Sequence, residues 1–80
     1  MDLCRGRVVK AKAGRDKNQF FVVVDFDDSF AFICDGRRRK LLKPKKKNIK
    51  HLALTAMVLL PEMMTSDKKI KSNLNNVEKI

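Results

Sequence analysis

The sequence predicts a small β-barrel with a short C-terminal helix. The chain has 80 residues, the size of one small domain with a marginal core. Short apolar segments separated by turn-forming residues precede Pro61, and they predict a few short strands. A flat sheet of so few strands would leave its faces and edges uncovered, whereas a sheet that curls into a barrel encloses a core. We therefore expect a mainly β barrel of four to five antiparallel strands at residues 3–55, followed at residues 56–80 by a linker and a helix.

The first two strands and their loop are predicted from residues 6–26. Val8 and Val9 open a stretch that continues as alternating Lys and Ala, a pattern typical of a half-exposed strand. Gly14 and Asn18 bound a polar segment and tolerate left-handed backbone angles, so a loop is expected there. Residues 19–26 (QFFVVVDF) are apolar on both faces, which indicates a central strand.

The following strands are predicted from turn signals. Residues 27–29 (DDS) favour a hairpin turn into a second apolar strand at 30–34 (FAFIC), and residues 35–36 (DG) favour another tight turn. Residues 37–42 (RRRKLL) are then expected to return as an antiparallel strand that ends, or lies at a sheet edge, near Pro44. A last short strand is expected within residues 48–57 (NIKHLALTAM).

The core and the C-terminal helix follow from the apolar residues. Five phenylalanines lie within residues 20–32, and the chain has no Trp or Tyr, so the core is expected to centre on them. Residues 65–67 (TSD) are typical of a helix start. Ile70, Leu74 and Val77 then form a narrow apolar stripe. We expect this helix to pack on the barrel and to fray near Ile80.

The charge is concentrated on the part that is expected to form the barrel. The net charge is +10, and residues 5–51 hold fifteen of the nineteen basic residues but only five of the nine acidic ones. The remainder is neutral. The electrostatic field of such a concentration of positive charge favours a polyanionic partner. Nucleic acid is the first candidate and an anionic membrane surface the second.

Residues 36–50 (GRRRKLLKPKKKNIK) contain nine Lys or Arg and no acid. Such a run is either a solvated tail, an import signal or a surface of a folded domain. Leu41, Leu42 and Ile49 are embedded in it, and a disordered insert in so small a barrel would be costly to close. We therefore expect a folded surface with Leu41 or Leu42 inward, every lysine in solvent, and Arg37 and Arg39 on the opposite side from Arg38.

Nothing in the sequence indicates catalysis, a metal or a cofactor. His51 is the single histidine and has no partner set for nucleophilic catalysis. Asp25, Asp27 and Asp28 flank a predicted turn, where acids usually form the turn or pair with cations. Two cysteines without metal-type spacing are expected to be reduced thiols. The longest apolar stretch, residues 52–61, is shorter than the ~20 residues of a membrane helix. We expect a cytoplasmic, non-enzymatic protein.

The segment CRGRVVKAKAGRDKNQFFVVVDFDDSFAFICDG, residues 4–36, resembles the KOW motif of ribosomal proteins and transcription factors. With the following RRRKLLKPKKKNIKHL it resembles the eukaryotic and archaeal family of large-subunit ribosomal protein fourteen, together with small bacterial KOW-domain proteins. This resemblance implies an SH3-like barrel that binds RNA without catalysis. It also implies that the loop of Gly14, Arg15, Asp16 and Lys17 touches RNA, although Asn18 stands where the motif often has a second glycine.

The expected function is RNA binding, ribosomal or ribosome-associated, by docking on folded rRNA. The predicted RNA-binding residues are those of the first loop and the basic run: Gly14, Arg15, Lys17, Arg37, Arg38, Arg39, Lys40, Lys43, Lys45, Lys46, Lys47 and Lys50. One alternative is a protein–protein adaptor that uses the apolar residues 52–64. Another is a binder of DNA or membrane surfaces by charge alone. No clear exposed aromatic platform for single strands is identified from the sequence.

Overall fold

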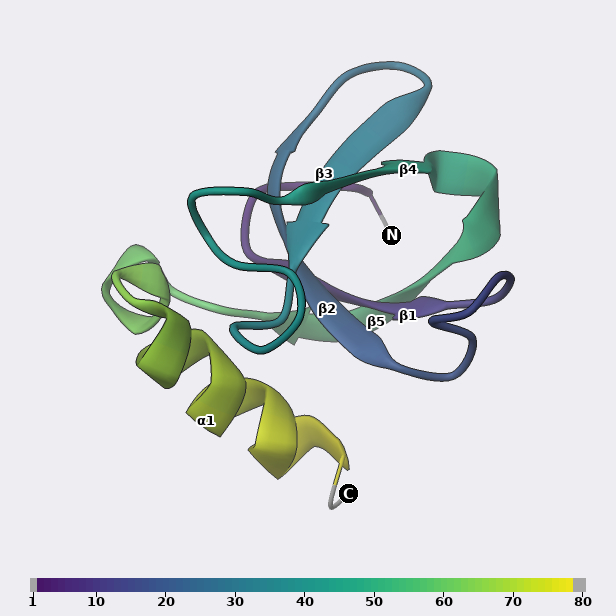
Figure 1. The fold of residues 1–80 in the computed structure, drawn as a ribbon. Helices are drawn as coiled ribbons and strands as arrows, with labels where there is room; N and C mark the ends of the chain where they lie inside the picture. The colour runs from purple at the N-terminus through teal and green to yellow at the C-terminus, as the bar shows by residue number, and fades with distance from the viewer. Residues whose placement is uncertain (1, 79–80) are drawn as a thin grey trace.

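The computed structural model describes residues 2–78, which form one curled antiparallel sheet, two 3-10 turns and a helix (Figure 1). The strands in this part of the chain are β1 (Arg7–Ala11), β2 (Phe20–Phe26), β3 (Phe30–Cys34), β4 (Lys45–Asn48) and β5 (Leu52–Val58). The turns are η1 (Ile49–His51) and η2 (Pro61–Met64), and the helix is α1 (Asp67–Glu78). The sheet order is β4-β3-β2-β1-β5. The predicted mainly β, barrel-like domain with a C-terminal helix is confirmed.

The central strand β2 is buried on both faces, as its sequence predicted. Phe21, Val22 and Val23 are fully buried, and β2 pairs with β1 on one side and β3 on the other. Inside the barrel, Phe21 and Val23 pack with Val9, Ala11, Ala31, Ile33 and Leu52. On the opposite face, Val22 packs with Val8, Cys34, Leu59, Met64, Ile70 and Leu74. The sheet therefore separates two small cores, and the second core depends on α1.

The phenylalanines contribute less to these cores than the sequence suggested. Phe21 is fully buried, but Phe20, Phe30 and Phe32 are only half-buried and Phe26 is 42% exposed. Valines, Ile33 and the helix residues fill the space instead. The prediction of a core centred on the aromatic residues was wrong in this respect, because the strand alternation turns Phe30 and Phe32 outward.

The β1–β2 loop (residues 12–19) has the predicted left-handed positions. Gly14 has a φ of +82° and Asn18 a φ of +72°. Asn18 N–H donates to the Ala11 carbonyl at 2.8 Å, and Ala11 N–H donates to the Gln19 carbonyl at 3.0 Å. Asn is one of the few non-glycine residues that adopts this conformation readily, so the loop closes without the second glycine.

The prediction of a strand at residues 37–42 was wrong. The β3–β4 loop (residues 35–44) consists of bends and turns, and β4 starts only after Pro44. Asp35 Oδ1 accepts the backbone N–H groups of Arg37 and Arg39 at 2.9 and 3.0 Å. These local hydrogen bonds use donors that a sheet ladder would require. As a result, Arg37 and Arg39 do not share a strand face opposite Arg38.

The helix starts and packs where the sequence indicated. Ser66 Oγ accepts the Lys69 N–H at 3.2 Å, and Ile70 and Leu74 are buried. Asp67 Oδ1 accepts the Leu41 N–H of the β3–β4 loop at 2.7 Å. Leu41 packs against the core that contains Ile70 and Leu74, whereas Leu42 is 95% exposed. One of the two leucines therefore points inward, as expected. The predicted fraying near Ile80 lies outside the described residues.

Candidate nucleic-acid interface

The β1–β2 loop and β4, which are far apart in the sequence, are held together by two lysines. Lys47 Nζ donates to the Ala13 carbonyl oxygen at 3.0 Å. Lys45 Nζ donates to Asp16 Oδ2 at 2.8 Å and forms an ion pair with it. Because of these contacts, the β1–β2 loop adjoins the strand of the basic run.

The strand register explains why these lysines point inward. β4 pairs with β3 so that Lys45 lies opposite Ile33 and Lys47 opposite Ala31, both fully buried. Lys47 is only 9% exposed, so its aliphatic stem is buried while its ammonium donates to the Ala13 carbonyl. The expectation that all lysines of the run face solvent was therefore wrong for Lys45 and Lys47.

Asp16 is the acidic centre of this arrangement. It is 3% exposed, and its hydrogen bond with Lys45 holds the pKa of its carboxyl below the usual value of 3.8, against the opposing effect of burial. Arg39 and Lys47 lower the pKa further by charge. Arg39 is half-buried, and its Nε is a buried nitrogen without a hydrogen-bond partner in the described part of the chain. Asp16 thus neutralises part of the inward-facing charge.

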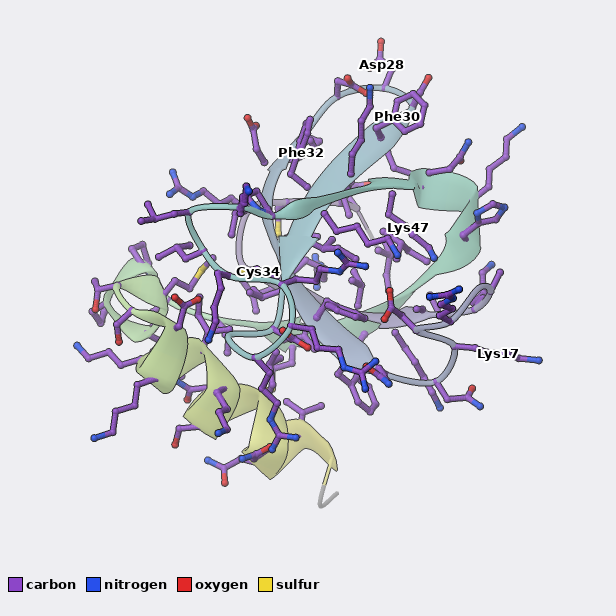
Figure 2. The ribbon with its side chains drawn as sticks, in the orientation of Figure 1. Lys17, Asp28, Phe30, Phe32, Cys34 and Lys47 are labelled. Atoms are coloured by element: carbon purple, nitrogen blue, oxygen red, sulfur yellow. The ribbon has the colours of Figure 1, made fainter. Side chains whose placement is uncertain are left out.

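The remaining predicted cations lie on the outside of the domain. They come from the two loops, from the outer face of β4 and from η1, and we call them the basic face: Arg15, Lys17, Arg37, Arg38, Lys40, Lys43, Lys46 and Lys50, all exposed. Lys17 extends away from the domain at the β1–β2 loop (Figure 2). Gly14 is exposed beside them, and a Cβ there would lie 3.2 Å from Lys47 Nζ.

An aromatic element that the sequence did not predict accompanies the basic face. Lys46 is opposite Phe32 on the outer face of the sheet, and its Nζ lies 4.3 Å from the centroid of the Phe30 ring, within the range of a cation–π contact. Figure 2 shows Phe30 and Asp28 at the far end of the β2–β3 hairpin. The pairing of Lys46 with Phe32 could have been anticipated only if β4 had been placed at the correct residues.

Asp27 has the turn-forming role that was predicted for the acidic residues around the β2–β3 turn. Asp27 Oδ1 accepts the N–H groups of Ser29 and Phe30, each at 2.8 Å. Both hydrogen bonds lower the pKa of the Asp27 carboxyl, and the bond from the Phe30 N–H has the larger effect. In residues 2–78 no group of three or more His, Cys, Asp or Glu side chains is placed to hold a metal ion.

In residues 2–78, cavities lie beside α1 and beside η2. The helix-side pocket, of about 280 Å³, is formed by the start of β2, the β3–β4 loop and α1, and it is lined by Gln19, Phe20, Asp35, Arg37, Arg38, Lys71, Leu74 and Asn75. The second, of about 370 Å³, is lined by Arg5, Leu59, Pro61, Met64 and Thr65.

The apolar residues 52–64 mostly serve the fold. Leu52, Leu59 and Met64 are core residues, whereas Val58 is 43% and Leu60 55% exposed. This distribution leaves Val58 and Leu60 as a small exposed apolar area on either side of the buried Leu59 in the sequence. Within residues 2–78, the helices are all too short or too polar to cross a membrane.

The chain matches no protein-family model, and no curated protein matches its sequence. The resemblance to KOW proteins therefore stays a prediction that rests on the residues quoted above.

Proposed function

We propose that this domain binds folded RNA, with ribosomal RNA as the first candidate, through phosphate contacts of the basic face. The observation that carries the proposal is the attachment of the β1–β2 loop to β4 by Lys45 and Lys47. The loop that carries Arg15 and Lys17 is thereby placed beside the strand that carries Lys46, and among the described residues the only ion pair is the one between Lys45 and Asp16. Phosphate-binding surfaces need this concentration of free cations.

The form of the surface favours folded RNA over a regular duplex. Its cations come from two loops, the strand β4 and the turn η1, so they do not repeat along one regular element. Lysines act as mobile point charges and suit an irregular phosphate backbone better than bidentate reading of base edges. Docking by charge and shape is the usual mode of recognition for structured RNA. The KOW resemblance supports the same function and adds the ribosome as the expected context.

The salt dependence of RNA affinity tests the proposal. Replacing Lys17 and Lys46 together by Ala removes two exposed cations of the basic face and leaves the inward lysines in place. If each contacts one phosphate, the slope of log affinity against log salt should flatten by about 1.4–1.8. The matched control replaces Lys68 and Lys69, two exposed lysines on α1, and should leave the slope unchanged. Equal slopes for the two double variants would contradict the assignment.

Co-sedimentation with ribosomes across a salt series tests the ribosomal context. Retention on the large subunit above physiological salt is the expected result, because shape-specific docking outlasts the loss of electrostatic attraction. Release at low salt, combined with equal affinity for duplex DNA, heparin and anionic vesicles, would indicate binding by charge alone and would refute the proposal.

A protein–protein adaptor is the second candidate, and the exposure of Val58 and Leu60 favours it. Binding through this area would be insensitive to salt. Leu60→Ser tests it without disturbing the core, whereas a change at Leu59, which is 2% exposed, would unfold the domain first. A partner whose binding survives high salt and is lost in Leu60→Ser would place the adaptor function ahead of RNA binding.

A further inference from the structure

The helix-side pocket combines cationic, amide and apolar side chains from different elements of the fold. It lies where the end of the β1–β2 loop, the β3–β4 loop and α1 meet, and its volume of about 280 Å³ is near the lower end of the ~300–1,000 Å³ typical of small-molecule sites. This size limits the ligand to a small molecule or to one unit of a polymer.

The pocket has several cationic side chains. Arg37, Arg38 and Lys71 line it, and among the described residues Asp35 is the one acid of the lining. The Asp35 carboxylate already accepts two backbone N–H groups of its own loop. Arg37 Nη2 donates to Asn75 Oδ1 at 3.2 Å, so the guanidinium is oriented by α1. Planar guanidinium groups and an ammonium are the usual ligands of a phosphate group.

The rest of the pocket suits a nucleobase. Phe20 and Leu74 supply apolar surface, and Gln19 and Asn75 supply amide groups that both donate and accept hydrogen bonds. Phe20 is half-buried, and Lys10 Nζ lies 5.6 Å from its ring centroid. An aromatic ring with neighbouring amides can stack on a base and contact its polar edge, whereas a bare phosphate would need neither.

We propose that the helix-side pocket binds a single unpaired nucleotide of the RNA, with its base against Phe20 and its phosphate on Arg37, Arg38 and Lys71. This inference rests on the proposed RNA-binding function and extends it in two ways. It gives α1 a role in RNA binding through Lys71. This lysine lies outside residues 5–51, in the part of the sequence that has no net charge. It also predicts a preference for RNA with a bulged or looped-out nucleotide over fully paired RNA.

Two measurements on the whole chain test the pocket. In the first, the amide NMR spectrum is followed during titration with uridine or adenosine 5′-monophosphate, and separately with inorganic phosphate. The nucleotides should shift residues 19–20, 35–38 and 71–75, and phosphate should shift only the cationic part. In the second, affinity is measured for an RNA hairpin with one bulged nucleotide and for the same hairpin fully paired.

Matched variants separate the pocket from general charge. Lys71→Ala should weaken binding of the bulged hairpin by about tenfold, the effect of losing one charge-assisted contact, and should change the paired hairpin little. Lys69→Ala removes the same charge from an exposed helix position outside the pocket and should have no such effect. Phe20→Leu should reduce the nucleotide shifts more than Phe30→Leu, with circular dichroism confirming that both variants fold.

The outcomes distinguish this inference from the proposed function. Equal binding of the two hairpins with a steep salt slope, or phosphate shifts identical to the nucleotide shifts, would overturn the pocket and leave RNA binding standing. If the nucleotides shift the pocket residues but the protein binds no RNA, the proposed function is refuted, and so is RNA as the ligand of the pocket. Equal effects of Lys71→Ala and Lys69→Ala would also overturn the pocket.

Discussion

The ion pair between Asp16 and Lys45 is expected to hold the β1–β2 loop in place, and removing it should destabilise the whole domain. The change is Asp16→Asn, which keeps the side-chain shape but removes the charge that faces Lys45 at 2.8 Å. A double-mutant cycle with Lys45→Met isolates the interaction, because the Met side chain retains most of the apolar stem.

The size of the effect follows from the exposure of the two partners. The Asp16 side chain is 5% and the Lys45 side chain 27% exposed. Breaking a fully buried pair costs about 3–5 kcal/mol, and breaking an exposed pair costs about 0–1 kcal/mol. Since Lys45 can regain water, we expect an intermediate loss of about 2 kcal/mol for Asp16→Asn and a coupling energy of about 1 kcal/mol. For a domain of this size, such a loss lowers Tm by roughly 8–16 °C.

The coupling should also depend on pH in a defined direction. The hydrogen bond with Lys45 lowers the pKa of Asp16 in the folded state, whereas the unfolded chain has the ordinary value. The pair therefore contributes its full stabilisation above the ordinary, unfolded pKa of 3.8, and the contribution is lost as the pH falls through the lower, folded pKa. The coupling energy should be constant near neutral pH and should decline below about pH 4.

Urea and thermal unfolding followed by circular dichroism measure these quantities for the four members of the cycle. Lys46→Met is the matched control, because Lys46 lies on the same strand but on its outer face and should show no coupling to Asp16→Asn. A coupling energy no larger than that of this control, or a coupling that persists in acid, would refute the assignment of the pair as the attachment of the loop.

Three further predictions concern the helix and the cysteines. Gly36→Ala should destabilise by about 1–3 kcal/mol in thermal unfolding, because Gly36 has a φ of +77° and a Cβ would collide with the Asp67 carbonyl; an unchanged Tm would contradict this packing. Asp67→Ala should cost about 1 kcal/mol by removing the acceptor of the Leu41 N–H, and native-state hydrogen exchange should show that amide less protected. Burial raises the pKa of the Cys34 thiol to about 12, so a thiol reagent should label Cys4 in the native protein and both cysteines only in denaturant; rapid native labelling of Cys34 would be inconsistent with the core.

The strands that the sequence predicted best are those with a strong local signal. In β2, apolar residues on both faces indicated a central strand, and the strand is buried on both faces. Gly14 and Asn18 indicated the loop before it, and both have left-handed backbone angles. In the helix, Ile70 and Leu74 have the expected spacing and are buried. In each case the information lies within a few residues, so tertiary packing strengthens a preference that is already present.

The β3–β4 loop could not be predicted in this way. Its sequence gives no alternation after Gly36, and its path depends on Asp67, which accepts the Leu41 N–H across 26 positions of the chain. The same limitation applies to β4. Three successive lysines have no difference in polarity that would show which of them face inward, and only the pairing with Ala31 and Ile33 determines it. Long-range contacts thus decided the elements on which the candidate site depends.

The alternation along β4 gives its lysines two separate tasks. Lys45 and Lys47 face inward and are satisfied by Asp16 and by the Ala13 carbonyl, so they stabilise the loop that carries Arg15 and Lys17. Lys46 faces outward and remains available to a phosphate. The total charge of the basic run therefore overstates the number of cations that are exposed to a polyanionic partner. Changes at the inward lysines should first affect stability, and changes at the outward ones should first affect the salt slope, because burial and solvation separate the two groups on a single short strand.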